Sequence, residues 1–213
     1  GKEILDAQVR ESAGKGSVVF IDVNHLNRTN YFKGGMETGD KYLSEVADAV
    51  RRSLRPGDMV YSRGGDELVV ILQNNSPEVV KNISQRMINE VDKSPSIRQI
   101  FRNEVSEITN RYKEINRANN YDSLNSELKL TLSKAERELA QTNFQDFKRI
   151  KTTELQEAFT EQARYRGSIS VGSSLIRHGE NSAQTLLRAE VQSGQVKAAY
   201  KAAYNIDVAS KYG

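Results

Sequence analysis

The chain has 213 residues, of which 37% are hydrophobic and 28% charged, and this balance predicts a soluble globular protein with one sizeable core. No apolar run approaches membrane-spanning length, no signal-peptide pattern opens the chain, and the small, evenly spread net charge of +3 does not favour nucleic acid as a partner. The absence of cysteine excludes disulfides, thiol catalysis and zinc-thiolate sites and suits a reducing compartment, so we expect a cytoplasmic location.

Hydrophobic periodicity predicts the first elements. Residues 2–12 form a short amphipathic pattern, and the nearly continuous apolar run SVVFIDV at 17–23 is typical of a strand buried on both faces. This strand ends in Asp22, at the carboxyl end where chemistry gathers in open α/β sheets. The segment 24–39 is polar and contains glycine, which predicts a loop, and it leads into a helix from about 40 to 54.

A β-hairpin is predicted at 60–72, where two apolar runs are joined by Gly64 and Gly65, because glycine supplies the positive φ angles that such turns need. Asp66 and Glu67 follow directly, and adjacent carboxylates repel each other and add nothing to hairpin stability. Carboxylates on a rigid turn, beside glycines that allow a phosphate to approach, suit a hard cation such as Mg²⁺. An ordinary acidic turn is the alternative interpretation.

After a helix at 78–91, the composition changes from residue 94 to residue 166, where glycine and strand patterns are absent. Apolar residues recur there at spacings of three and four, which predicts an antiparallel helical hairpin, a coiled coil, inserted into the fold and projecting from it. The first run is Phe101, Val105, Ile108, Tyr112 and Ile115. The second is Leu124, Leu128, Leu132, Ala135 and Leu139, which slips near Thr142 before it resumes at Phe147, Ile150, Leu155 and Phe159.

Strand pattern returns at 168–175, followed by a helix at 181–204 and a short edge strand at 206–209. Without the inserted helices, the order is strand, helix, hairpin, helix, strand, helix, strand. This order predicts an α+β fold, a ferredoxin-like palm backed by helices and formed by residues 1–93 and 167–213.

Together these features resemble the GGDEF domain of diguanylate cyclases, which condense two GTP into cyclic di-GMP. The resemblance covers residues 17–92 and 167–209. The run at 64–67 stands as the signature, Gly-Gly-Asp-Glu, with Leu68 where phenylalanine is usual, and Ala189-Glu190 stands for the customary Ala-Asp. The resemblance implies the palm of the nucleotidyl cyclases, GTP as substrate, cyclic di-GMP as product, and a homodimer in which two bound GTP meet, for which the helical insertion is a candidate contact.

The resemblance also implies the roles of individual residues. A metal site for two Mg²⁺ or Mn²⁺ ions is assigned to Asp22, the Val23 carbonyl, Asp66 and Glu67. Catalytic roles are assigned to Asp66, Glu67, Lys197 and Lys201. Substrate binding is assigned to His25, Leu26, Asn27, Asn30, Asp40, Gly64 and Gly65. A product-binding inhibitory site is assigned to Arg55 and Asp58.

Each assignment has a structural alternative. Asp22 could cap the element that follows it, and Lys197 and Lys201, four apart on one helix face, could simply face solvent. Arg55 and Asp58 could shape the turn after a helix.

The chain departs further from the family pattern after the first strand and before the signature, and the usual Asn-Asp pair becomes Asn30-Tyr31. Residues 24–27 replace the usual Asp-x-Phe-Lys, so that a lysine near the phosphates is absent, and Ser62 replaces an arginine that is here shifted to Arg63. Three functions therefore remain open: an active cyclase, a degenerate domain that binds GTP or cyclic di-GMP without turnover, and a scaffold that supports the helical arm.

Overall fold

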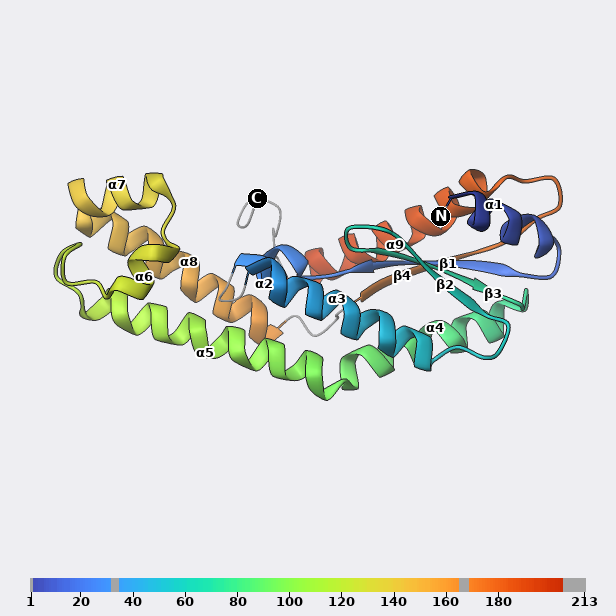
Figure 1. Cartoon of the computed structure of the whole chain (residues 1–213), viewed down its shortest axis with the longest axis horizontal. Coiled ribbons are helices and arrows are strands. Elements are labelled where there is room, and N and C mark those ends of the chain that lie inside the picture. The colour runs from blue at the N-terminus through green and yellow to red at the C-terminus, as the bar shows by residue number, and fades with distance from the viewer. Residues whose placement is uncertain (1, 32–34, 165–168, 205–213) are drawn as a thin grey trace.

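The computed structural model describes residues 2–31, 35–164 and 169–204. Figure 1 shows a sheet covered by helices at one end and a helical arm that extends away from the sheet at the other. We call the first part the palm and the second part, residues 95–164, the arm. None of the helices in the described residues combines the length and apolar character needed to cross a membrane.

The palm contains one four-stranded sheet with the strand order β2-β3-β1-β4, in which all neighbours are antiparallel. The strands are β1 (Ser17–Val23), β2 (Met59–Gly64), β3 (Glu67–Leu72) and β4 (Ile169–Leu175). The predicted α+β class and the predicted hairpin are confirmed. The predicted edge strand at 206–209 lies outside the described residues.

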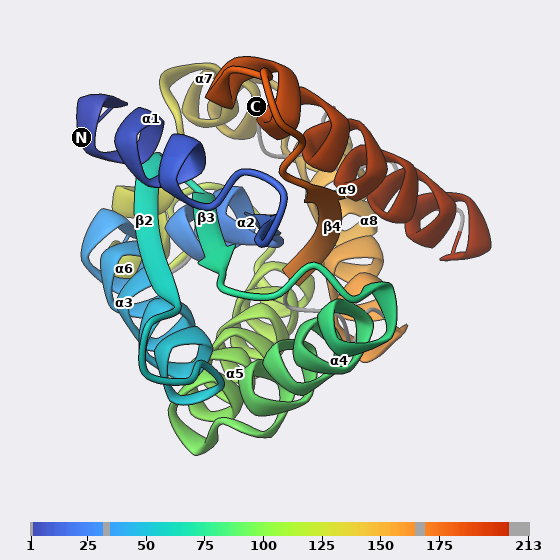
Figure 2. The same ribbon diagram turned by 90° about the vertical axis from the view of Figure 1, so that its right-hand side faces the viewer.

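The two faces of the sheet follow from the alternation of side chains along β1. Val19, Ile21 and Val23 belong to a core shared with α3 (Gly35–Arg52) and α4 (Pro77–Lys93). Val18 and Phe20 point the other way, into a core shared with α1 (Lys2–Glu11) and α9 (Ser182–Tyr204). Figure 2 shows these helix pairs on opposite sides of the sheet. Burial of each such aliphatic side chain contributes about 1.5–3 kcal/mol, which holds both layers to the sheet.

The loop predicted at 24–39 is wrong in part. A short helix, α2 (Leu26–Tyr31), follows β1, and α3 begins at Gly35 instead of about residue 40. Periodicity does not reveal α2 because its buried side chains, Arg28 and Thr29, are polar. A tertiary ion pair from Arg28 to Glu104 holds this helix, and such a contact is not visible in a hydrophobic pattern.

The arm consists of α5 (Pro95–Arg117), α6 (Ser126–Thr131), α7 (Lys134–Thr142) and α8 (Phe144–Arg164). Helices α5 and α8 lie antiparallel, because Gln156 bonds Tyr112 at 3.0 Å and Lys148 bonds the Asn116 carbonyl at 2.6 Å. The arm has its own apolar core, which includes Ile108 and Phe147.

The second half of the arm is divided into three helices: one break coincides with the predicted slip near Thr142, and the other, between α6 and α7, was not predicted. The Asn125 side chain caps α6, and a capping box between Ser133 and Glu136 starts α7, so the chain breaks where these caps form. Ile150 and Phe159, assigned to the buried run, are exposed. That residues 94–166 are an insertion into the family pattern, and a coiled coil, stays a prediction.

Candidate functional site

Two predicted site carboxylates, those of Asp22 and Glu67, face each other across the centre of the sheet. The β1–β3 register pairs Asp22 with Glu67 directly. Phe20 on β1 and Val69 on β3 point into the core under α9, so alternation directs both carboxylates to the α9 side. Directly opposed side chains in such a ladder lie about 4.5–5.5 Å apart at Cβ, and the sheet therefore forces two like charges together.

The turn between β2 and β3 places Asp66 beside this pair. Gly64 and Gly65 have φ angles of 121° and 56°, which only glycine adopts without strain, and no atom lies within 4 Å of where a Cβ would sit. The Val23 amide donates to the Asp66 carbonyl at 2.8 Å, which fastens the turn to the end of β1. The turn is thus fixed by main-chain bonds, and its outer side is open.

Glu67 shows the electrostatic consequence of this crowding. Partial burial raises the pKa of Glu67 above its ordinary value, and the guanidinium of Arg63 opposes that rise. The nearby carboxylates of Glu190, Asp66 and Asp22 add to it, because each makes a second negative charge less favourable.

Arg63 links the hairpin to α9. A register shift between Ser62 and Gly64 leaves Arg63 as the extra residue of a bulge, and its guanidinium lies 3.0 Å from Glu190 and 3.6 Å from Glu67. It also lies over the Phe20 ring at 5.7 Å. One cation therefore offsets part of the negative charge that the acids of this site carry.

Lys197 of α9 pairs with Asp22, the Nζ–Oδ1 distance being 2.6 Å. Helix α9 comes this close because Gly172 has no side chain: a Cβ there would collide with the backbone of Ala189 and Ser193. The side chain of Lys201, which the prediction grouped with Lys197, lies outside the described residues.

The donors at this site suit a hard dication by type, since carboxylates and a carbonyl are the ligands that Mg²⁺ takes in proteins. Their arrangement is not a finished ligand cage. Among the described residues, no three acid or histidine side chains are grouped closely enough to hold a metal ion. The Lys197 ammonium stands next to Asp22, where a dication would supply the positive charge instead.

The residues predicted to bind the nucleotide follow β1 directly. His25 has a φ of 70° and is buried, Leu26 and Asn27 open α2, and Asn30 lies near its end. A Cβ at Gly39 would collide with the Asn30 amide oxygen, so the side chain of Asn30 packs on the turn of α3 that carries Asp40. This oxygen is buried and has no hydrogen-bond partner among the described residues. The structure therefore brings Asn30 and the turn with Asp40 together.

Arg55 and Asp58 lie at the other end of the hairpin. Both oxygens of the Asp58 carboxylate accept backbone N–H groups, from Arg55 at 3.1 Å and from Gln73 at 3.0 Å. The carboxylate of Asp58 thus shapes the turn, and the predicted inhibitory site stays a prediction.

A cavity of about 820 Å³ lies elsewhere, between α3, α5 and α6. Thr38 and Lys41 of α3 and Glu104 and Arg111 of α5 are part of its lining, and no predicted site residue is. The candidate site is therefore an open surface at the end of the sheet, and none of its predicted residues lines this cavity.

Residues 2–106 match the family model described as "Diguanylate cyclase, GGDEF domain". This chain carries a GGDEF domain. The match includes α1 and the first half of α5 and ends before β4. The predicted resemblance is confirmed, and its extent differs from the predicted 17–92 and 167–209.

Curated relatives of the GGDEF domain are similar over part of the chain. The diguanylate cyclase DgcS of Shewanella oneidensis is 36% identical over 69 residues, which are 32% of this chain and 23% of that protein. The diguanylate cyclase DosC of Escherichia coli K12 is 32% identical over 78 residues, 37% of this chain and 17% of that protein. The chain thus spans less than a quarter of the length of these relatives.

Solved structures show the same fold over nearly the whole chain. The diguanylate cyclase SiaD of Pseudomonas aeruginosa, in complex with its activator SiaC, aligns with a TM-score of 0.55 at 17% identity, over 93% of this chain and 55% of that one. The GGDEF domain of DgcB of Caulobacter crescentus, in complex with c-di-GMP, aligns with a TM-score of 0.51 at 16% identity, over 92% of this chain and 82% of that one.

Sequence reasoning on the GGDEF domain missed the ion pair between Arg63 and Glu190 and the pairing of Lys197 with Asp22. Arg63 stands one position from where the family pattern has an arginine, and that shift is the sequence signal for the bulge. The second pair joins residues 175 positions apart, and no local pattern reports such a contact.

Proposed function

We propose that this GGDEF domain is a diguanylate cyclase that condenses two GTP into cyclic di-GMP and releases pyrophosphate. The observation that supports this most is the pairing of Asp22 with Glu67 on the α9 side of the sheet, with the ammonium of Lys197 at 2.6 Å from Asp22. Acids and a lysine that meet at an open sheet end are the groups that phosphoryl transfer uses.

In the proposed reaction, the 3′-oxygen of each GTP forms a bond to the α-phosphorus of the other, and at each phosphorus the bond to the bridging oxygen of the pyrophosphate breaks. Two pyrophosphates leave with the bonding electrons, and each attacking hydroxyl loses its proton. In this proposal a carboxylate oxygen of Glu67 accepts that proton.

Lys197 has two partners in this proposal. In the ligand-free domain its ammonium neutralises Asp22, and with nucleotide bound it and Lys201 neutralise the β and γ phosphates. Asp22, Asp66, Glu67 and the Val23 carbonyl would hold Mg²⁺ or Mn²⁺, which supplies charge neutralisation on the phosphates when bound.

The nucleotide is oriented by the segment after β1. The backbone of His25, Leu26 and Asn27, together with Gly64 and Gly65, lies against the phosphates, and Asn30 and Asp40 bind the guanine edge. The Asn30 amide oxygen has no hydrogen-bond partner within residues 2–31, 35–164 and 169–204, and this supports the assignment because a guanine N–H would satisfy it. One domain holds one GTP, so turnover needs two domains facing each other with twofold symmetry. GTP as substrate places the domain in the cytoplasm.

The test is incubation of the chain with GTP and Mg²⁺, with analysis for pyrophosphate and a cyclic dinucleotide. Formation of both supports the cyclase. If calorimetry shows binding of GTP or cyclic di-GMP but no product forms, the chain is a degenerate binding domain. If it binds neither, the scaffold function is the one that remains.

A further inference from the structure

Helix α5 belongs to both parts of the molecule. Ile97 and Ile100, in its first two turns, are buried in the palm core, and Ile108 and Ile115, further along, are buried in the core of the arm. The helix is continuous from residue 95 to residue 117. Helix α5 therefore connects the core of the palm directly to the core of the arm.

The same helix holds the segment that follows β1. Phe101 of α5 contacts the His25 ring edge to face, with centroids 5.9 Å apart, and lies 5.6 Å from the Arg28 guanidinium. It also packs on Tyr42, whose hydroxyl donates to the Asn24 carbonyl at 2.9 Å. One aromatic ring thus supports residues 24, 25 and 28 at once.

A buried ion pair adds to this contact. Arg28 Nε lies 3.2 Å from Glu104 Oε2, and the two side chains are only 0% and 3% exposed. Charges this deeply buried are held in one geometry, because either side chain alone would leave an uncompensated charge away from water. Phe101 of α5 therefore contacts His25, which directly precedes α2, and Glu104 of α5 pairs with Arg28 inside α2.

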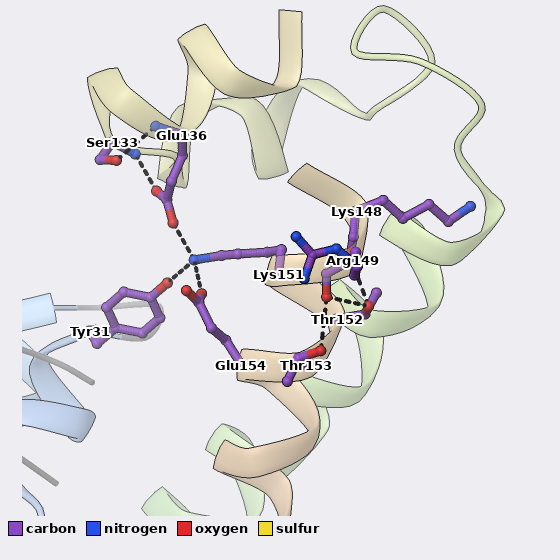
Figure 3. A network of polar contacts seen from close by, with 9 residues as sticks. All are labelled: Tyr31, Ser133, Glu136, Lys148, Arg149, Lys151, Thr152, Thr153 and Glu154. Carbon is purple, nitrogen blue, oxygen red and sulfur yellow. Dashed lines mark hydrogen bonds and ion pairs between the residues drawn. The ribbon is translucent and has the colours of Figure 1, made fainter. Parts of the chain in front are cut away.

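The end of α2 is held by the arm in the same manner. Tyr31 accepts a hydrogen bond of 2.7 Å from Lys151 of α8, and the guanidinium of Arg111 on α5 lies 5.7 Å from its ring. Figure 3 shows Lys151 between Tyr31, Glu136 and Glu154, so that α2, α7 and α8 meet at one ammonium group. Both ends of the segment 24–31 thus depend on the arm.

We propose that Phe101 and Glu104 are positioning residues of the nucleotide site, and that nucleotide affinity depends on where the arm holds the segment 24–31. The inference rests on the proposed function for the nucleotide, since His25, Leu26 and Asn27 are the backbone expected at the phosphates. Neither residue touches the nucleotide. They act through His25, Arg28 and the Asn24 carbonyl. Asn24 and His25 directly follow the candidate metal ligands Asp22 and Val23.

The test uses Phe101→Leu and Glu104→Gln in the full chain. Glu114→Gln is the matched control, because Glu114 lies on the same helix and its carboxylate accepts the Asn125 amide inside the arm. Phe101→Tyr keeps the aromatic ring and serves as the conservative rescue. Should Glu104→Gln fail to fold, because it removes a buried negative charge that lies beside Arg28, Phe101→Leu carries the test alone.

The first readout is amide hydrogen exchange of residues 24–31 without nucleotide. We expect exchange about tenfold faster in Phe101→Leu and Glu104→Gln, and unchanged in Glu114→Gln and Phe101→Tyr. The second readout is calorimetric affinity for a non-hydrolysable GTP analogue with Mg²⁺, which we expect to fall about tenfold in the same two variants.

The two readouts separate the two proposals. Exchange in 24–31 that matches the Glu114→Gln control overturns the positioning role, even if the variants melt at lower temperature and whatever the affinities are. An unsubstituted chain that binds no GTP analogue overturns the proposed function, while the exchange result still decides whether α5 holds the segment.

Discussion

The palm and the arm both contain charged side chains that are partly or fully removed from water. Their surroundings favour the charged form in the arm and the neutral form at Glu67 in the palm. In the arm, burial alone would lower the pKa of Lys151, but Tyr31, Glu136 and Glu154 together raise it. Glu136 has a lowered pKa, since its bonds to Lys151 and Ser133 outweigh the effect of burial. In the palm, Glu67 has a raised pKa because burial and three neighbouring carboxylates disfavour its charge.

This difference separates a structural contact from a candidate site. The positive charge of Lys151 is compensated by Glu136 and Glu154, and the network joins α2, α7 and α8 (Figure 3). The acids of the palm are only partly compensated by Arg63 and Lys197, which leaves them suited to receive a further cation. Substitutions on each side should therefore act on different quantities: activity in the palm and stability in the arm.

The largest effect is expected for Asp66→Ala. Product formation from GTP should fall at least about a hundredfold, because a carboxylate that the chemistry needs is removed. The fold should persist, since the part of Asp66 that the structure uses is its carbonyl, which alanine retains. The measurement is pyrophosphate release together with thermal unfolding. Asp48→Ala, an exposed change on α3, is the control and should leave turnover unchanged.

In the arm, Lys151→Met should destabilise the protein by about 3 kcal/mol, because it leaves the carboxylates of Glu136 and Glu154 without their buried cation. Lys134→Met is the matched control, because Lys134 is exposed and its Nζ lies 3.9 Å from Glu138 Oε1. The loss of unfolding free energy in this variant should stay under about 0.5 kcal/mol. Urea unfolding measures both. Equal losses in the two variants would mean that the Lys151 network contributes no more than a surface pair.

Nucleotide choice tests the palm more finely. GTP should be preferred over ATP, because the Asp40 carboxylate accepts from the guanine N1–H and amino group and meets an acceptor in adenine. Asp40→Asn should reduce that preference about tenfold to a hundredfold, measured as the ratio of kcat/KM values for the two nucleotides. Asp48→Asn on the same helix should leave the ratio unchanged. A chain that uses both nucleotides equally well would contradict the assignment of Asp40.

The smallest effect concerns Glu67 and pH. A folded-state pKa above the unfolded one means that the native protein loses stability as pH rises through that window, and the penalty is complete above the folded pKa. Glu67→Gln should therefore melt about 2 °C above the unsubstituted chain at neutral pH, a modest shift because the side chain is a third exposed.

The advantage of Glu67→Gln should vanish as pH falls below the unfolded pKa of glutamate, where both chains are neutral at this position. Thermal melts across this pH range measure it, with Glu78→Gln at an exposed position of α4 as the control. A variant less stable than the parent at neutral pH would show that Glu67 is not electrostatically strained.

The sequence was sufficient for most of the palm because its signals are local. The apolar run 17–23, the Gly-Gly turn, the helical periodicities of α3 and α4, and the Asn181-Ser-Ala start of α9 each report their own element. The short helix α2 was not predicted, because the buried ion pair of Arg28 with Glu104 holds it instead of an apolar stripe. The break between α6 and α7 was not predicted, because apolar spacing alone does not show that the capping box at Ser133 starts a new helix.

By itself, the sequence determined the family, the α+β class and the residues on which chemistry could rest, because residue identity and short spacings carry that information. Only the tertiary structure decided what those residues meet: that Asp22 stands opposite Glu67 and beside Lys197, and that Phe101 and Glu104 hold the segment after β1. These contacts join positions up to 175 residues apart. They arise from strand register and helix packing, which are properties of the whole fold and of no single stretch of the chain.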